Sequence, residues 1–201
     1  MLLLTSRVVA DPPPDWLLNQ ALKRKSSGIN QATMNNWGSD FTERSLHKNG
    51  SIFINAFNHS VFLNHDCLSW AQEFITLNAK DIRITSTYPG FERCGPHIDR
   101  TRNFTLMFLI QTGGDHHETV FYKEKNTLDL VRPKGYHVDD YDKLDQIKTI
   151  VLQKNAWNLI NGRILHSIEY IIDGRISIQI SMDELDPNLI LTDTHWYYDY
   201  N

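Results

Sequence analysis

The second half of the chain carries a series of short strand patterns separated by turn signals, and this series limits the fold most strongly. Asn161-Gly162 and Asp173-Gly174 each stand between two stretches rich in β-branched residues. Asn-Gly and Asp-Gly are the dipeptides most typical of β-hairpin turns. The stretches with strand character are Lys80–Tyr88, Phe104–Ile110, Glu118–Tyr122, Ile147–Gln153, Ala156–Ile160, Ile164–Ile172 and Arg175–Met182. This spacing predicts a mainly β fold built from short strands.

Two segments nearer the N-terminus have helical patterns instead. The first begins at Asp15, directly after the extended Pro12-Pro13-Pro14, because an acidic residue favours a helix start and proline forbids helix interior. The second is His65–Asn78, whose apolar residues recur at helical spacing. Helices with one apolar face need a surface to cover, and a sheet supplies one. We therefore predict a β-sandwich or jelly roll of the cupin-like kind, braced by N-terminal helices.

At 201 residues the length suits a single domain. Its expected parts are an N-terminal helical and loop support over 1–79, a jelly-roll core over 80–182 and a C-terminal tail over 183–201. Within the support, Asn30–Asn49 is polar and rich in turn formers, so we expect a loop there. The role of the aromatic tail stays open.

The core is interrupted by a long charged insertion over residues 123–145. Its acidic residues are Asp139, Asp140, Asp142 and Asp145. We interpret it as a solvated connecting loop. A calcium site is an alternative, although the spacing and the glycine of an EF-hand are missing.

Composition excludes some partners. The net charge of −4 and the pI near 6.1 lack the basic footprint of a nucleic-acid-binding protein. No stretch approaches the roughly 20 apolar residues of a membrane helix, and Leu2–Leu4 is too short for a signal peptide. Cys67 and Cys94 are too few for a disulfide framework. We expect a cytoplasmic protein without a membrane or nucleic-acid partner, and its oligomeric state stays open.

Three residues form a candidate metal site. His97 and Asp99 stand in an H-x-D pair, and His166 lies on a later predicted strand. Two imidazoles and one carboxylate make up the facial triad of non-heme Fe(II) oxygenases, which leaves the opposite positions of the metal open. Taken singly, each signal is weak, since H-x-D strings arise by chance and a lone histidine on an apolar face is commonly a core residue. The combination predicts a metal site, because a jelly roll brings an early and a late strand together.

The last predicted strand offers an independent signal. Its odd-numbered positions, beginning with Arg175 and Ser177, are polar, whereas Ile176 and its even-numbered neighbours are apolar. Alternate strand residues point to one face, so Arg175 and Ser177 leave the same side. A guanidinium fork beside a hydroxyl suits one end of a dicarboxylic acid. Arg175 alone could equally be an exposed residue.

The order of these residues resembles that of the 2-oxoglutarate- and Fe(II)-dependent dioxygenases, in particular their prolyl-4-hydroxylase-like branch. Four segments carry the resemblance: Tyr88-x-Gly90 followed by His97-x-Asp99, Gly113-Gly114-Asp115 with Thr119-Val120-Phe121, Asn161–Ser167, and Gly174-Arg175-Ile176-Ser177. Together they cover Ile82–Ser181, about half of the chain. The first 80 residues and the acidic insertion match no pattern of this family. His116-His117-Glu118 also departs from it, and adjacent strand residues cannot both join one site.

The resemblance implies a double-stranded β-helix with Fe(II) on His97, Asp99 and His166. Arg175 would pair with the distal carboxylate of 2-oxoglutarate, with support from Ser177 and a hydrogen bond from Tyr88. The implied partner is an amino-acid, peptide or small-molecule substrate. The implied reaction hydroxylates an amino-acid or peptidyl substrate with O2, releases succinate and CO2, and uses ascorbate as a possible reductant. It needs no catalytic residue beyond the metal ligands.

Two residues near the H-x-D pair, Arg100 and Arg102, are candidates for binding an acidic substrate, although both could be surface residues. Two other classes of protein stay open. One is a different metal enzyme on a cupin-like fold, which would favour three or four histidines and need no arginine for a keto acid. The other is a metal-binding or sensory module without turnover. Asp99 argues against a halogenating relative, whose site lacks the carboxylate ligand.

Overall fold

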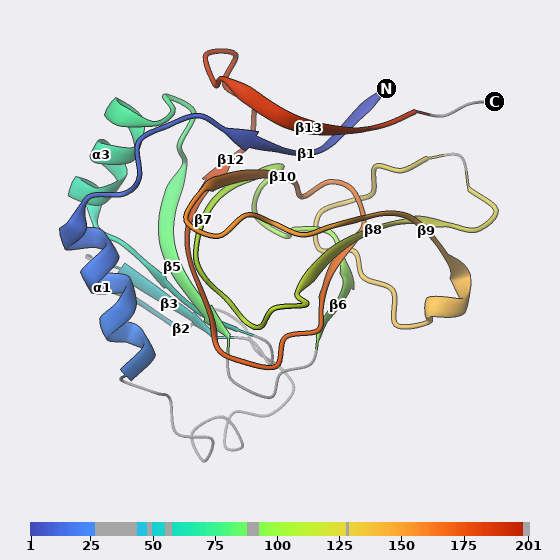
Figure 1. The fold of residues 1–201 in the computed structure, drawn as a ribbon, viewed down its shortest axis with the longest axis horizontal. Coiled ribbons are helices and arrows are strands. Elements are labelled where there is room, and N and C mark those ends of the chain that lie inside the picture. The colour runs from blue at the N-terminus through green and yellow to red at the C-terminus, as the bar shows by residue number, and fades with distance from the viewer. Residues whose placement is uncertain (27–43, 48–49, 55–57, 88–92, 128, 199–201) are drawn as a thin grey trace.

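The computed structural model (Figure 1) describes residues 1–26, 44–47, 50–54, 58–87, 93–127 and 129–198. Its strands form two antiparallel sheets. The nine-stranded sheet has the order β13-β1-β10-β7-β12-β5-β4-β3-β2, and the four-stranded sheet has the order β6-β11-β8-β9. The larger sheet consists of β1 (Leu2–Val8), β2 (Arg44–His47), β3 (Gly50–Ile54), β4 (Asn58–Phe62), β5 (Asp81–Thr87), β7 (Phe104–Thr112), β10 (Trp157–Asn161), β12 (Arg175–Met182) and β13 (Leu191–Tyr197). The smaller one consists of β6 (Arg93–His97), β8 (Glu118–Glu124), β9 (Leu144–Ile150) and β11 (His166–Glu169).

The path from β5 to β12 defines the fold. Strands β5, β7, β10 and β12 lie in the larger sheet, whereas β6, β8, β9 and β11 lie in the smaller one, so the chain passes repeatedly between the two. The resulting neighbours are β10-β7-β12-β5 in one sheet and β6-β11-β8-β9 in the other. This is a double-stranded β-helix, the jelly roll predicted from the sequence.

Helices α1 (Asp15–Ser26) and α3 (His65–Phe74) lie on the outer face of the larger sheet (Figure 1). Leu17 and Ala71 are fully buried there, in one apolar cluster with the even-numbered isoleucines of β12. Asn64 caps α3, since its side chain accepts a hydrogen bond of 3.2 Å from the Cys67 N–H. Both helices were predicted, and each packs its apolar face on the sheet. No helix in the described ranges is long and apolar enough to cross a membrane.

The inner face of β12 is polar, yet it is as buried as the outer one. Every residue of Arg175–Met182 is buried, because the helices cover one face and the second sheet covers the other. Gln179 Nε2 donates to Ser177 Oγ at 3.1 Å, and Arg83 of β5 donates to Ser181 at 3.2 Å. A polar wall therefore lines the interior between the sheets.

The termini differ from the sequence prediction. Leu2–Val8, expected within the helical and loop support, forms β1 between β10 and β13, and Leu191–Tyr197 of the expected tail forms β13. Leu3 packs into the cluster under the helices, whereas Leu4 packs into a second cluster on the other face. A strand buried on both faces does not alternate between apolar and polar residues, so the usual sequence signal of a strand was missing for β1.

The loop expected over Asn30–Asn49 lies largely outside the described residues, but Arg44–His47 forms β2. The acidic insertion does connect β8 to β9, with a short 3-10 turn over Tyr141–Lys143 capped by Asp140. Within the part of the chain that is described, the one group of three or more side chains placed to hold a metal lies elsewhere. The calcium alternative therefore finds no support.

Candidate metal centre

The fold brings His97, Asp99 and His166 together. His97 ends β6 and His166 begins β11, and the two are direct partners in the antiparallel pairing of these strands. Their rings lie 4.6 Å apart, centre to centre. Asp99 follows β6 by two residues. Potential ligand atoms of the three side chains all lie within 4.8 Å of one another.

Each imidazole is oriented by the backbone two residues before it. His97 Nδ1 lies 2.8 Å from the Gly95 carbonyl oxygen, and His166 Nδ1 lies 2.9 Å from that of Ile164. A ring that donates its Nδ1–H to a carbonyl keeps the lone pair on Nε2, the form that binds a metal. Both rings are thus held as ligands should be.

The two histidines differ in their protonation. Burial, with His97 beside it, lowers the pKa of His166 to about 3, so this ring is neutral. Burial also lowers the pKa of His97, but Cys94, Asp99 and the Gly95 carbonyl outweigh it and raise that pKa to about 10. Burial raises the pKa of Asp99, and His97 and Arg83 oppose it. A divalent cation would take the place of the proton on His97.

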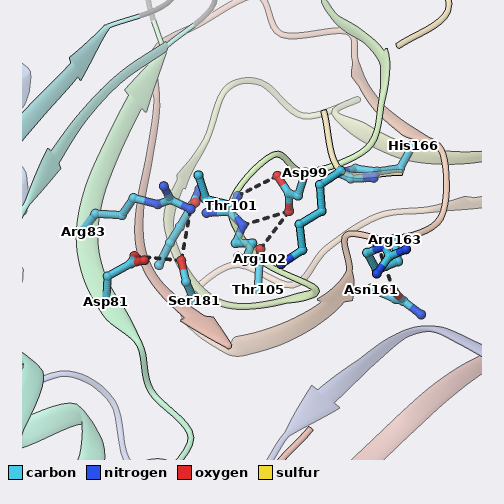
Figure 2. Close-up of polar contacts among 12 residues, drawn as sticks. Asp81, Arg83, Asp99, Thr101, Arg102, Thr105, Asn161, Arg163, His166 and Ser181 are labelled. Atoms are coloured by element: carbon cyan, nitrogen blue, oxygen red, sulfur yellow. Dashed lines mark hydrogen bonds and ion pairs between the residues drawn. The ribbon is translucent and has the colours of Figure 1, made fainter. Parts of the chain in front are cut away.

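The carboxylate of Asp99 is held from several sides (Figure 2). Arg102 donates from Nε to Oδ2 at 2.8 Å and from Nη2 to Oδ1 at 3.1 Å, and Thr105 Oγ1 donates to Oδ2 at 3.1 Å. Gly162 packs directly against this side chain, since a Cβ at that position would lie 2.8 Å from Asp99 Cβ and 2.9 Å from Cγ. Sequence reasoning missed Thr105 and Gly162. The Asn-Gly signal marked a turn there, and nothing local shows that the turn meets Asp99.

Arg175 is not a surface residue. It is 3% exposed at the start of β12, and its Nη2 lies 3.5 Å from the sulfur of Met107. Its Nη1 is buried and has no hydrogen-bond partner among the described residues. Burial lowers the pKa of Arg175 to about 10, while Cys94 raises it. A buried guanidinium without a carboxylate is costly, and an anionic ligand would relieve that cost.

The other predicted site residues have different fates. Ser177, 2% exposed, accepts its hydrogen bond from Gln179. Tyr88 lies outside the described residues. Arg100 is exposed and its aliphatic stem lies beside Gly135. Among the described residues, the hydrogen bonds to Asp99 side-chain oxygens come from Arg102 and Thr105 and not from Arg100.

The inserted histidines point apart, as predicted. His116 is exposed. His117 is 3% exposed, with Nδ1 at 3.1 Å from the Gly114 carbonyl oxygen and Nε2 at 3.1 Å from that of Leu152. Burial and the positive charge of Arg175 lower its pKa. His117 belongs to the packing behind Arg175 and does not join the triad.

The donor set fits a metal such as Fe(II). Two neutral imidazole nitrogens and one carboxylate oxygen, from one side only, are the ligands that non-heme Fe(II) sites use. Cys94 links this cluster to Arg175, because its sulfur lies 3.7 Å from His97 Nδ1 and it raises the pKa of both His97 and Arg175. The triad and the Arg175 guanidinium therefore share one part of the interior.

No family model and no curated protein matches the chain, but solved structures are similar to it. SnoK, a non-heme alpha-ketoglutarate-dependent carbocyclase from nogalamycin biosynthesis, is 10% identical with a TM-score of 0.47, over 89% of this chain and 80% of SnoK. A cupin-like protein from Thermotoga maritima is 15% identical with a TM-score of 0.33, over 70% of this chain and 82% of that one.

E. coli ycfD is 15% identical with a TM-score of 0.40, over 67% of this chain. The match spans only 36% of the length of ycfD. The structural neighbours therefore include both an alpha-ketoglutarate-dependent enzyme and a cupin-like protein. Because all three TM-scores lie below 0.5, the function proposed below rests on the side chains of this chain.

Proposed function

We propose that this protein is an Fe(II)- and 2-oxoglutarate-dependent dioxygenase. The observation that supports it most is the combination of a His-Asp-His cluster with a buried arginine, Arg175, whose Nη1 has no hydrogen-bond partner among the described residues. A cupin-like enzyme with histidine ligands alone would need neither Asp99 nor Arg175. A metal that binds a keto acid needs both an open face and a cation for the distal carboxylate.

In this proposal His97, Asp99 and His166 hold the iron. When bound, the iron and 2-oxoglutarate supply the oxidising chemistry, which consumes O2 and releases succinate and CO2. Arg175 binds the distal carboxylate of 2-oxoglutarate as a charge-assisted fork, and Ser177, next on the same face of β12, supports it. Apolar side chains that include Leu109, Phe121 and Ile164, all fully buried, keep water from this interior.

We further propose that the reaction is a hydroxylation of an amino-acid or peptidyl substrate, with ascorbate as a reductant of the iron. This finer assignment rests on the similarity of the Gly-Arg-x-Ser and H-x-D segments to the prolyl-4-hydroxylase-like branch. Cys67 and Cys94 are both free thiols, which fits a reducing cytoplasm.

The first test concerns the triad. Anaerobic protein with Fe(II) and 2-oxoglutarate should show a metal-to-ligand charge-transfer band, and His166→Ala should abolish the band and the bound iron. His116→Ala removes an exposed histidine outside the triad and should leave both unchanged. If His166→Ala binds iron and releases succinate like wild type, the triad is assigned wrongly.

The second arm of this test separates a keto-acid enzyme from a metal module. Arg175→Ala should weaken 2-oxoglutarate binding by about 2–5 kcal/mol, because it leaves the ligand carboxylate without its partner. That is roughly 30-fold to several-thousand-fold in affinity. Arg175→Lys keeps the charge but loses the fork, so it should fall between. Both variants should retain iron. Unchanged 2-oxoglutarate affinity in Arg175→Ala would leave a metal-binding module as the better description.

A further inference from the structure

The guanidinium of Arg102 has two nitrogens that donate to Asp99 and a third that has no hydrogen-bond partner among the described residues. Nε and Nη2 form the fork that holds the two oxygens of Asp99. Nη1, at the other corner, is buried and has no hydrogen-bond partner among the described residues. A buried N–H group without an acceptor costs about 1–3 kcal/mol. Holding Asp99 requires only the fork, so the fork alone does not account for a buried Nη1.

The carboxylate that Arg102 holds also acts on a second arginine. Asp81 and Asp99 both act on the charge of Arg83, which donates to Ser181, while Ser181 donates to Asp81 (Figure 2). Asp99 is therefore shared between Arg83 and Arg102. An anion at Nη1 would add a negative charge beside the two guanidinium groups, which favours burial of both.

Arg102 and Arg175 reach this interior from different segments. Arg102 follows β6, whereas Arg175 begins β12, and its Nη2 lies 3.5 Å from the sulfur of Met107. Met107 lies two positions from Thr105 on β7, about 7 Å at the strand rise of ~3.3 Å per residue, and Thr105 contacts Asp99. The two guanidinium groups are therefore separate anion sites within one interior, and variants at each arginine distinguish them.

We propose that Arg102 is a second anion site, which binds a carboxylate or phosphate group of the substrate through Nη1 while its fork keeps Asp99 in place. The site requires only the protein's own residues, but its assignment to the substrate rests on the proposed dioxygenase function. It makes the substrate an acid, anchored beside Asp99, while the cosubstrate is anchored at Arg175. Arg100, which is exposed, has no part in it.

The test measures thermal unfolding of metal-free protein titrated with inorganic phosphate, and separately with acetate, at constant ionic strength. Binding raises the stability in proportion to ln(1 + [L]/Kd). We expect Tm to rise by about 3–6 °C at ten times Kd with at least one anion. Whichever anion acts identifies the group that the site prefers. Arg102→Gln should abolish the rise, and the matched variant Arg100→Gln should keep it.

Two further variants control for lost support of Asp99 and for the other arginine. Thr105→Val removes a hydrogen bond to Asp99 but leaves Nη1 intact, so it should keep the rise. Arg175→Gln should keep the phosphate or acetate rise and lose only the rise produced by 2-oxoglutarate. Each variant is compared with its own Tm without anion, so a less stable Arg102→Gln still gives an answer.

The inference is overturned if neither anion raises the Tm of wild type, or if Arg102→Gln responds as wild type does. A loss of the response in Arg100→Gln as well would also overturn it, because general screening of charge would then explain the effect. An Arg102-dependent rise in a protein that shows no iron-dependent turnover would instead leave the anion site standing and remove the dioxygenase proposal. The two failures are therefore distinguishable.

Discussion

The two faces of β12 are equally buried but differ in their interactions, which are apolar packing on the outer face and hydrogen bonds on the inner one. On the outer face, Ile176, Ile178 and Ile180 pack with both helices, and each is at most 1% exposed. On the inner face lie Arg175, Ser177, Gln179 and Ser181. Gln179 donates to Ser177, and Ser181 bonds to Arg83 and Asp81 of β5, whereas Nη1 of Arg175 has no hydrogen-bond partner among the described residues. Apolar burial stabilises the fold by itself, whereas polar burial stabilises it only where every group has a partner.

Unpartnered atoms gather on the inner side. Arg102 Nη1, Arg175 Nη1 and Thr119 Oγ1 are buried without hydrogen-bond partners in the described part of the chain. Thr119 lies two residues from Phe121 on β8, so both point to the interior between the sheets. The comparison indicates that the outer face carries the stability, while the inner face keeps unsatisfied donors for ligands.

The largest expected effect on stability lies on the outer face. Ile178→Ala should lower the free energy of unfolding by about 2–5 kcal/mol, because it opens a cavity in a fully packed cluster. Iron affinity per folded molecule should not change, since the site lies on the other face. Denaturant unfolding and isothermal titration of the metal measure the two quantities. A large loss of metal affinity in folded Ile178→Ala would show that the faces are not independent.

The next largest effect is a loss of metal affinity, caused by a change on the inner side that leaves the outer face of β12 intact. Gly162→Ala would place a Cβ 2.8–2.9 Å from the Cβ and Cγ of Asp99, so the carboxylate must move. Displaced support of a metal ligand costs up to about 100-fold in affinity, close to 2.7 kcal/mol. Competition with a metal-binding dye measures it. Gly95→Ala is the matched control, because a Cβ there meets nothing within 4 Å, and equal losses in both variants would contradict the role of Gly162.

The smallest effect concerns Asp186, a buried carboxylate outside the metal site that accepts several hydrogen bonds. Burial raises the pKa of Asp186, but hydrogen bonds from Asn188, Thr76 and Leu77 outweigh it and hold the pKa below its ordinary value. Its contribution to stability is therefore present above the ordinary pKa near 3.8 and is lost as pH falls through the lowered one.

Asp186→Asn should cost about 1 kcal/mol at pH 7, because its hydrogen bonds lose their charge assistance. The difference from wild type should shrink as pH falls below about 3.8, and urea unfolding at several pH values would show it. A difference that stays constant down to pH 2 would mean that the charge of Asp186 does not stabilise the fold.

Local sequence determined the elements with regular patterns. The alternation of β12 identified its two faces, and the H-x-D pair with His166 and Arg175 identified the residues that the fold gathers inside. These features are legible because side-chain periodicity depends on neighbours only a few positions apart. The same reasoning missed β1 and its partner β13. Leu2–Val8 is buried at most positions, so its sequence has no alternation of apolar and polar residues to mark a strand.

The tertiary structure alone decided which residues meet across the interior. His97 opposes His166 through the register of β6 and β11. Gly162 and Thr105 meet Asp99 only because separate segments converge there, and Arg102 turns to the same carboxylate while Arg100 does not. Contacts between distant positions depend on strand register and sheet closure, which are set by the packing of the whole chain rather than by any local stretch.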